Sequence, residues 1–387
     1  MFSRRSAWDL RANRLAAALE ERRRAGRVID LTLSNPTRAG LVYPAQITRA
    51  MAQADASRYE PEPRGLSAAR DAVSRYYADQ GLGASAEQLV LTASTSEAYA
   101  FLFKLLTDPG DQVLVPRPSY PLFEFLATLE AVETVPYPLR YDSRGWTVDV
   151  DRLAAALGPR TRAVVLVHPN NPTGSFVKRD ERRAIEELAA ERDLALICDE
   201  VFADYGVPLP EPARAASFAG PSDVLAFALS GLSKVVGLPQ LKLSWIVVQG
   251  PPALQQQALA RLEVIADTYL SVGTPVQQAL PELLAARAGV QQEIARRVQG
   301  NLALLRARLA VPGPVRLLDC EGGWYAVLEV DAEEEELVVG LVRDQGVLVH
   351  PGYFYDFPRE GYVVLSLLSP ELDEGLDRML ERLRRVA

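Results

Sequence analysis

The sequence predicts an α/β protein with a large three-layer αβα domain, built on a mostly parallel sheet, and a smaller α+β domain. Apolar strands, such as 163–167 (AVVLV) and 194–198 (LALIC), alternate with amphipathic helices between residues 65 and 250. Near-continuous apolar strands are typical of parallel sheets that helices cover on both faces. Beyond residue 251 the pattern becomes mostly helical, and strands and helices then mix up to residue 387.

The individual elements follow from these periodicities and from the turn signals between them. The expected strands are 88–91, 112–115, 131–135, 163–167, 194–198, 224–228, 243–248, 325–330 and 362–367. The expected helices are 65–77, 96–106, 120–130, 150–157, 180–191, about 290–309, 335–343 and 370–385. We expect a large domain over 45–285 and a small domain formed by 1–44 with 286–387.

Composition excludes several classes of protein. The 42 basic and 50 acidic residues give a net charge of −8, which argues against a nucleic-acid or anionic-membrane partner. Two cysteines and two histidines cannot supply a disulfide framework or an ordinary zinc site, so no metal is expected. No run of 18 apolar residues predicts a membrane span, and residues 1–10 lack the apolar core of a signal peptide. We therefore expect a cytoplasmic protein.

Polar residues follow four of the predicted strands. Thr95 and Ser96 open a helix, Asn171 lies in the loop HPNNPTG, Asp199 ends a buried strand, and Lys234 closes the string SGLSK. Ligands of open parallel sheets bind beyond the carboxyl ends of the strands. These four strand ends are therefore the expected site of chemistry.

Each of these strand ends suits one part of pyridoxal phosphate. Hydroxyls at a helix start bind phosphate, an aspartate can hold a cationic ring nitrogen, a lysine can form a Schiff base, and an asparagine can contact a phenolate-type oxygen. Each signal alone also fits an ordinary turn, helix cap or chance string. Their joint occurrence at strand ends is what indicates the cofactor.

Lysine scarcity supports the assignment of Lys234. Only four of the basic residues are lysines. Lys104 lies within a helix and Lys178 follows a turn, so we expect both at the surface. Lys242 follows Lys234 by eight residues. Only Lys234 combines a strand-end loop with nearby serines.

At this point the chain resembles a known family, the fold type I pyridoxal-phosphate enzymes of the class I/II aminotransferases. The resemblance covers nearly the whole chain. It rests on the four loops above and on the strings LSNP (33–36), YEPEPRG (59–65), PRPSY (116–120) and EGGWY (321–325). It implies a homodimer with shared active sites and a small domain that closes over a small-molecule amino donor and keto acceptor.

The resemblance implies a role for each residue. Lys234 would bind the cofactor as a Schiff base and move protons, Asp199 would pair with the pyridinium, Asn171 would contact the 3-oxygen, and Tyr120 would stack on the ring. Tyr59 would reach the phosphate of the neighbouring subunit. The remaining cofactor-site residues, most of them around the phosphate, would be Ser94, Thr95, Ser96, Ser230, Lys242 and Phe202.

Three positions depart from the family pattern. Phe202 stands where a tyrosine usually donates to the 3-oxygen, which predicts a raised pKa for the Schiff base unless Phe202 merely packs and Tyr205 or Asn171 compensates. Lys242 replaces an arginine and keeps the positive charge without the bidentate fork. Val364 occupies the position of the arginine that grips the substrate carboxylate. The candidates to substitute for it are Arg38, Arg64 and Arg359.

The predicted function is transamination, in which an amino group moves from an amino acid or amine donor to a keto acceptor. The alternative is another reaction at the α-carbon with the same cofactor, namely β-elimination, decarboxylation, or oxidation or hydroxylation by oxygen. The carboxylate grip sets which α-carbon bond reacts, so the valine at position 364 favours this alternative more than usual.

Overall fold

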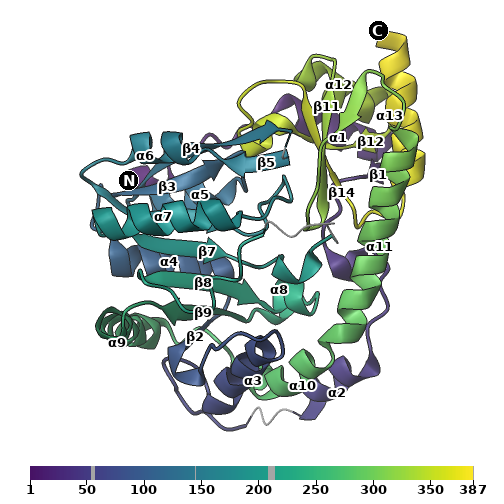
Figure 1. Ribbon diagram of the computed structural model, residues 1–387. Coiled ribbons are helices and arrows are strands. Elements are labelled where there is room, and N and C mark those ends of the chain that lie inside the picture. Colours follow the sequence, from purple (N-terminus) through teal and green to yellow (C-terminus); the bar gives the residue numbers. More distant parts are fainter. Residues whose placement is uncertain (54–56, 144, 208–213, 387) are drawn as a thin grey trace.

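The computed structural model describes residues 1–53, 57–143, 145–207 and 214–386. Its centre is an eight-stranded sheet (Figure 1). In spatial order the strands are β2 (Leu89–Thr92), β9 (Ser244–Gln249), β8 (Ala226–Gly231), β7 (Ala195–Asp199), β6 (Thr161–Val167), β3 (Gln112–Arg117), β4 (Glu133–Asp142) and β5 (Gly145–Val148). The run from β8 to β4 is parallel, whereas β9 and β5 are antiparallel to their neighbours. The predicted mostly parallel sheet is confirmed.

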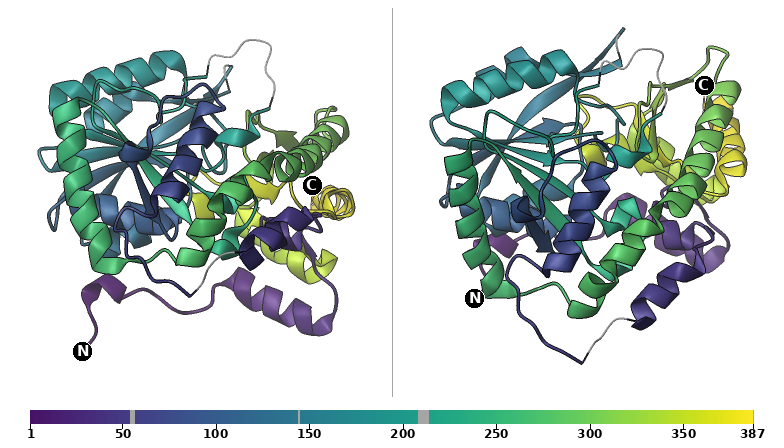
Figure 2. Two further views of the ribbon diagram at one scale, coloured as in Figure 1. Left: turned by 90° about the horizontal axis from the view of Figure 1, so that it is seen from below. Right: turned by 60° about the horizontal axis from the view of Figure 1, so that its bottom comes forward.

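Helices cover both faces of this sheet, as Figure 2 shows from two further directions. One face packs against α4 (Thr95–Leu106), α5 (Leu122–Leu129) and α9 (Pro252–Tyr269). The opposite core includes residues of α3 (Ser67–Ala78), α6 (Val150–Ala156) and α7 (Arg179–Arg192). Successive side chains of a strand point to opposite faces of the sheet, so Val164 packs in one core and Val165 in the other. A strand buried on both faces needs the continuous apolar run seen in the sequence.

The C-terminal part forms a second, four-stranded antiparallel sheet. Its order is β10 (Val315–Leu317), β11 (Tyr325–Val330), β14 (Tyr362–Ser366) and β13 (His350–Pro351). The short strand β1 (Ile29–Asp30) pairs in parallel with β12 (Val347–Leu348), so the N-terminal segment joins this part. The division into domains at residues 45 and 285 remains a prediction.

The remaining helices connect these parts or lie on the second sheet. The long helix α11 (Arg287–Arg308) runs along one side of the molecule (Figure 1). The others are α1 (Arg14–Ala25), α2 (Ala45–Gln53), α8 (Leu232–Val235), α10 (Thr274–Ala285), α12 (Glu334–Gly340) and α13 (Leu372–Val386).

The expected strand 131–135 instead continues to Asp142 and turns back as β5. The sequence did not predict this extension because Pro136 and Pro138 lie in it, and proline lacks the backbone N–H that strand pairing uses.

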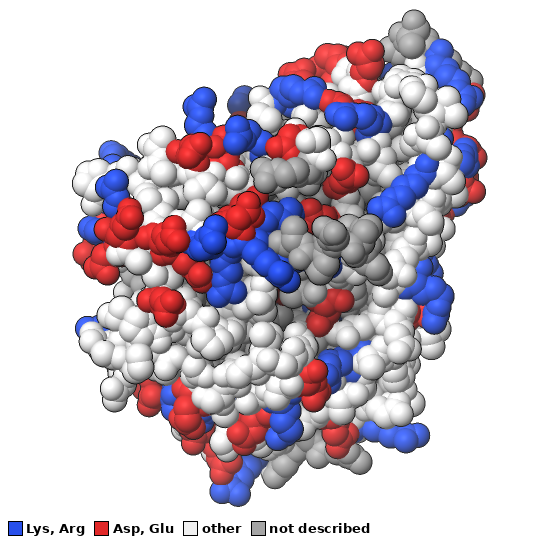
Figure 3. All heavy atoms as spheres, viewed as in Figure 1, with Lys and Arg blue, Asp and Glu red and all other residues white. Residues whose placement is uncertain are grey.

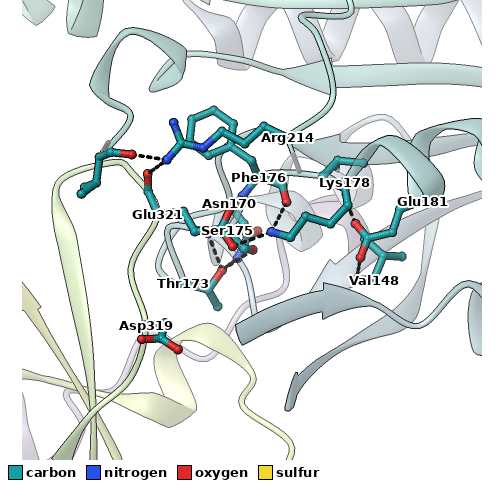
Figure 4. A network of polar contacts seen from close by, with 12 residues as sticks. Val148, Asn170, Thr173, Ser175, Phe176, Lys178, Glu181, Arg214, Asp319 and Glu321 are labelled. Atoms are coloured by element: carbon teal, nitrogen blue, oxygen red, sulfur yellow. Dashed lines mark hydrogen bonds and ion pairs between the residues drawn. The ribbon is translucent and has the colours of Figure 1, made fainter. Parts of the chain in front are cut away.

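A buried polar network joins the loop after β6 to the segment that leads into β11 (Figure 4). The Nζ atom of Lys178 lies 2.5 Å from Oε1 of Glu321 and donates to the carbonyl of Phe176 at 2.8 Å. The backbone carbonyl of Glu321 accepts from Arg214 at 2.6 Å. The prediction of a surface Lys178 was therefore wrong, because this lysine is only 7% exposed. Lys104 lies at the surface as expected.

The surface carries both signs of charge. In Figure 3 the basic and acidic side chains intermingle over the face seen in Figure 1, and the net charge of the chain is −8. Within the described residues, no helix has the length and hydrophobicity required to span a bilayer.

Candidate active site

The carboxyl ends of β2, β6, β7 and β8 surround one cavity of about 490 Å³. Nine of the eleven residues predicted for the cofactor site line this cavity. They are Ser94, Thr95, Ser96, Tyr120, Asn171, Asp199, Phe202, Lys234 and Lys242. The side chains that the sequence places at separate strand ends therefore meet in space.

The first wall of the cavity is the N-terminus of α4. The Oγ atom of Ser94 accepts from the backbone N–H of Glu97 at 3.1 Å, and the Glu97 carboxylate accepts from the N–H of Ala93 at 2.7 Å. The cap by Ser94 fixes where the helix begins, and Glu97 holds the residue before it. It leaves the hydroxyls of Thr95 and Ser96 and the first helical N–H groups beside the cavity, which is an arrangement that binds anions.

Asp199 ends β7 with its carboxylate beside the cavity. Oδ1 accepts from the N–H of Val201 at 3.2 Å, and Oδ2 accepts from the hydroxyl of Tyr99 at 3.3 Å. Burial raises the pKa of Asp199 to about 6, although these hydrogen bonds and the charge of Lys234 oppose the rise. A buried carboxylate with two long hydrogen bonds favours an additional cationic partner.

Lys234 lies in the short helix α8, and its amine lines the same cavity. Burial lowers the pKa of Lys234 to about 8, while the carboxylate of Asp199 raises it. The Nζ atom lies 5.1 Å from the ring centre of Phe202 and 4.7 Å from that of Trp324. A lowered pKa supplies the neutral amine that nucleophilic attack on an aldehyde requires.

Asn171 gives a direct test of whether the cavity suits a polar ligand. Its side chain is 8% exposed, and its Oδ1 atom has no hydrogen-bond partner among the described residues. The neighbouring Asn170 instead bonds to Ser119, Pro118 and Thr173 and so holds the loop together. A buried amide oxygen without a partner is costly unless a donor satisfies it. The Nδ2 group of the same amide is the part that could donate to a ligand oxygen.

Phe202 packs between the cavity and the segment that leads into β11. Its ring meets Trp324 edge-on at 5.2 Å. Tyr205 does not compensate for the missing phenol, because its hydroxyl donates to the backbone carbonyl of Lys234 at 2.7 Å. Tyr205 therefore holds the lysine-bearing helix, and Asn171 is left as the polar group of this region.

Two predicted residues lie outside the cavity lining. Ser230 is 2% exposed, and its Oγ atom is buried without a partner among the described residues. Ser230 is absent from the lining of the cavity, and its place at the phosphate stays a prediction. Tyr59 is 73% exposed and lines a different surface pocket with Gly65 and Leu270.

The sequence prediction missed much of the cavity wall. The missed hydroxyls are Ser34, Ser233 and Ser244, and the second sheet and its loops add Tyr325, His350, Phe354 and Tyr355. His350 had no signal of its own in the sequence. A pattern of distant strands meeting across two sheets cannot be read from local spacing.

The side of the cavity formed by the second sheet contains no arginine among the described residues. Val364 is 1% exposed and pairs directly with His350 across β13 and β14. Arg64 forms ion pairs with Glu87 and Glu263, Arg359 pairs with Glu329, and Arg38 is exposed. Of the three arginines predicted as substitutes, none lines the cavity.

Comparison with known proteins decides the family. The family model for class I and II aminotransferases matches residues 27–382. The chain belongs to this family. It is similar to the glutamate-pyruvate aminotransferase AlaA of Escherichia coli K12, with 27% identity over 95% of this chain and 92% of that protein. It is also 28% identical to the alanine aminotransferase of Mycobacterium tuberculosis, over 91% of this chain and 85% of that one.

Solved structures agree on the fold. The alanine aminotransferase of Pyrococcus furiosus superposes with a TM-score of 0.91 over all of both chains, at 22% sequence identity. An aspartate aminotransferase double mutant of Thermus thermophilus gives a TM-score of 0.82 at 25% identity, again over all of both chains. The protein is thus a pyridoxal-phosphate-dependent aminotransferase with the type I fold.

The cavity of this aminotransferase fits its cofactor. A buried asparagine amide, a buried carboxylate, a lysine with a lowered pKa and a helix N-terminus all border the same space. These are the groups that a phenolic oxygen, a ring nitrogen, an aldehyde and a phosphate require.

Proposed function

We propose that Lys234 holds the cofactor and moves the proton in this aminotransferase. The observation that carries the proposal is the position of Lys234, whose amine shares one cavity with Asp199 and Asn171. When bound, the cofactor supplies an electron-withdrawing ring that eases proton loss from the α-carbon of the donor. The Nζ atom of Lys234 would accept that proton and return it at the end of the exchange.

The other residues would orient the cofactor and stabilise its charges. The Asp199 carboxylate would keep the ring nitrogen protonated, because an anion in a buried site favours a neighbouring cation. The Asn171 amide would bond the ring oxygen, and Tyr120 would stack on one face of the ring. The start of α4 and Lys242 would neutralise the phosphate, since helix N–H groups and an ammonium both favour an anion.

We further propose that the enzyme works as a cytoplasmic homodimer in which Tyr59 reaches the site of the partner subunit. Support comes from Tyr59 itself, which is 73% exposed and lies outside the cavity lining of its own chain. Sedimentation of the protein, together with cofactor affinity of Tyr59→Phe, tests this arrangement. A monomer with normal cofactor affinity would contradict it.

At the substrate end we infer recognition by neutral polar groups. The Nδ1 atom of His350 and the hydroxyl of Tyr355 are 2.8 Å apart, and burial lowers the pKa of His350, so the imidazole is neutral at pH 7. An uncharged imidazole and hydroxyls bind a carboxylate less tightly than a guanidinium does. The names of the similar proteins make L-alanine the first donor to try.

A single-turnover assay tests the function. Cofactor-loaded protein is mixed with L-alanine, with L-alaninamide, which lacks the carboxylate, and with plain amines, while the absorbance and the product masses are followed. We expect pyridoxamine phosphate and a keto product, with alanine and its amide differing by less than about tenfold. Release of ammonia or carbon dioxide, or consumption of oxygen, without a keto product would instead support the alternative reactions at the α-carbon.

A further inference from the structure

Two serines lie near the predicted phosphate end of the cavity, and the structure separates them. Ser230 and Ser244 are both 2% exposed. Ser244 lines the cavity, whereas Ser230 does not. No hydrogen bond of the Ser244 hydroxyl is found among the described residues. A buried hydroxyl that borders a cavity and has no protein partner is available to a ligand there.

The position of Ser244 in the sheet brings it between three parts of the site. It begins β9, and it pairs directly with Thr92 of β2 on one side and with Gly231 of β8 on the other. Three residues after Thr92 the helix α4 begins, and three residues after Gly231 comes Lys234. Lys242 lies two residues before Ser244 and lines the same cavity. Ser244 thus lines one cavity together with the start of α4 and two lysines.

Gly231 and Ser244 share the space for one side chain. A Cβ atom added to Gly231 would lie 2.2 Å from the Oγ atom and 2.8 Å from the Cβ atom of Ser244. Atoms do not approach so closely, so a residue with a side chain fits at only one of these two positions unless the backbone moves. The side chain that occupies this space is that of Ser244.

We propose that Ser244 donates a hydrogen bond to the phosphate of the cofactor, and that it does so in place of the predicted Ser230. A phosphate carries close to two negative charges and needs several donors. The start of α4 and Lys242 supply donors from two sides, and the hydroxyl of Ser244 supplies one from the sheet. The inference rests on the proposed binding of the cofactor beside Lys234.

The affinity of the cofactor-free protein for pyridoxal phosphate and for pyridoxal, which lacks the phosphate, separates this role from simple packing. Both affinities are measured by absorbance titration, with no substrate present. We expect Ser244→Ala to bind pyridoxal phosphate at least about tenfold more weakly, because the charged phosphate loses one hydrogen-bond donor. Its affinity for pyridoxal should not change. The matched control Ser230→Ala, which removes a hydroxyl without a partner, should change neither affinity.

A swap of the two side chains tests the shared space. Gly231→Ser alone should fold poorly or bind the cofactor weakly, since its side chain meets that of Ser244. Ser244→Gly alone should lose affinity for pyridoxal phosphate as Ser244→Ala does. The double variant Gly231→Ser with Ser244→Gly restores one hydroxyl to the same space and should recover most of that affinity.

The outcomes are distinct. Equal losses of affinity for both ligands in Ser244→Ala, or no loss at all, would overturn the role of Ser244. A loss in Ser230→Ala confined to pyridoxal phosphate would restore the original prediction and overturn ours. If the unaltered protein binds neither ligand, the proposed cofactor site itself fails, which is a different result from the failure of Ser244 alone.

Discussion

The two ends of the active-site cavity are built differently. The cofactor end comes from the carboxyl ends of neighbouring strands in one sheet and contains Asp199, Lys234 and Lys242 as charged groups. The substrate end comes largely from the second sheet and its loops, and its described polar groups are hydroxyls and the imidazole of His350. The first end is specialised for charge, and the second for neutral hydrogen bonds and aromatic contact. We therefore propose that the cofactor end keeps the chemistry of the family, whereas the donor is recognised without the usual arginine.

The largest effect should come from removing the amine at the cofactor end. Lys234→Ala lacks the group that holds the cofactor and moves the proton, so we expect transamination to fall by about 10³-fold or more. Rapid mixing with L-alanine measures this rate. Lys104→Ala, which removes an exposed lysine, is the control and should behave like the unaltered enzyme. Near-normal turnover in Lys234→Ala would refute the assignment.

The next effect concerns the connection between the two ends. Lys178→Ala would leave the Glu321 carboxylate buried without its cation, which should lower the free energy of unfolding by about 3–5 kcal/mol. Urea denaturation measures this change. Replacing both partners by apolar residues, as in Lys178→Met with Glu321→Leu, should recover much of the stability. A loss below about 1 kcal/mol in the single variant would show that the pair contributes little.

A smaller effect is expected at the substrate end. His350→Phe removes the imidazole but keeps an aromatic ring, and kcat/KM for both L-alanine and L-alaninamide should fall about tenfold, the effect of one hydrogen bond or two. Tyr353→Phe, in the adjacent loop, serves as the control. If only alanine lost activity, the imidazole would be a specific carboxylate ligand, contrary to the neutral recognition inferred here.

The smallest effect should come from Phe202→Tyr, which offers a phenol beside the cofactor. One added hydrogen bond to the ring oxygen contributes about 1 kcal/mol. It should lower the pKa of the Schiff base, measured by spectral titration, by less than about one pH unit. The direction follows because the bond favours the deprotonated chromophore. Phe202→Leu should not lower this pKa. An unchanged titration in Phe202→Tyr would indicate that position 202 only packs against Trp324.

The same contrast explains what could be predicted from the sequence. Asn171, Asp199 and Lys234 lie at the end of an apolar strand or in the loop that follows one, and the carboxyl ends of parallel strands lie at one edge of the sheet. Local spacing therefore located Asn171, Asp199 and Lys234. At the substrate end, His350 and Tyr325 come from strands of a different sheet, and their meeting depends on how the two sheets pack. No local pattern encodes that packing.

Individual errors have equally physical causes. Lys178 looked like a surface residue because lysine is rarely buried without a partner, and its partner Glu321 lies 143 positions away. Ser230 was predicted as a phosphate ligand because it is near Lys234 in sequence, and that role stays a prediction; the serine that lines the cavity is Ser244, on the neighbouring strand β9. Cross-strand pairing, rather than nearness along the chain, decides which hydroxyl borders the cavity.

Chemical reduction of the cofactor-loaded enzyme tests the central claim most directly. Borohydride converts a Schiff base into a stable secondary amine, and peptide mass spectrometry then locates the modified lysine among the four in the chain. Our account predicts that the pyridoxyl group is found on Lys234 alone. It also predicts that Lys234 is not labelled when the enzyme is first incubated with an amino donor that it accepts as a substrate. Modification of Lys242, or the absence of any modified lysine, would contradict the proposed active site.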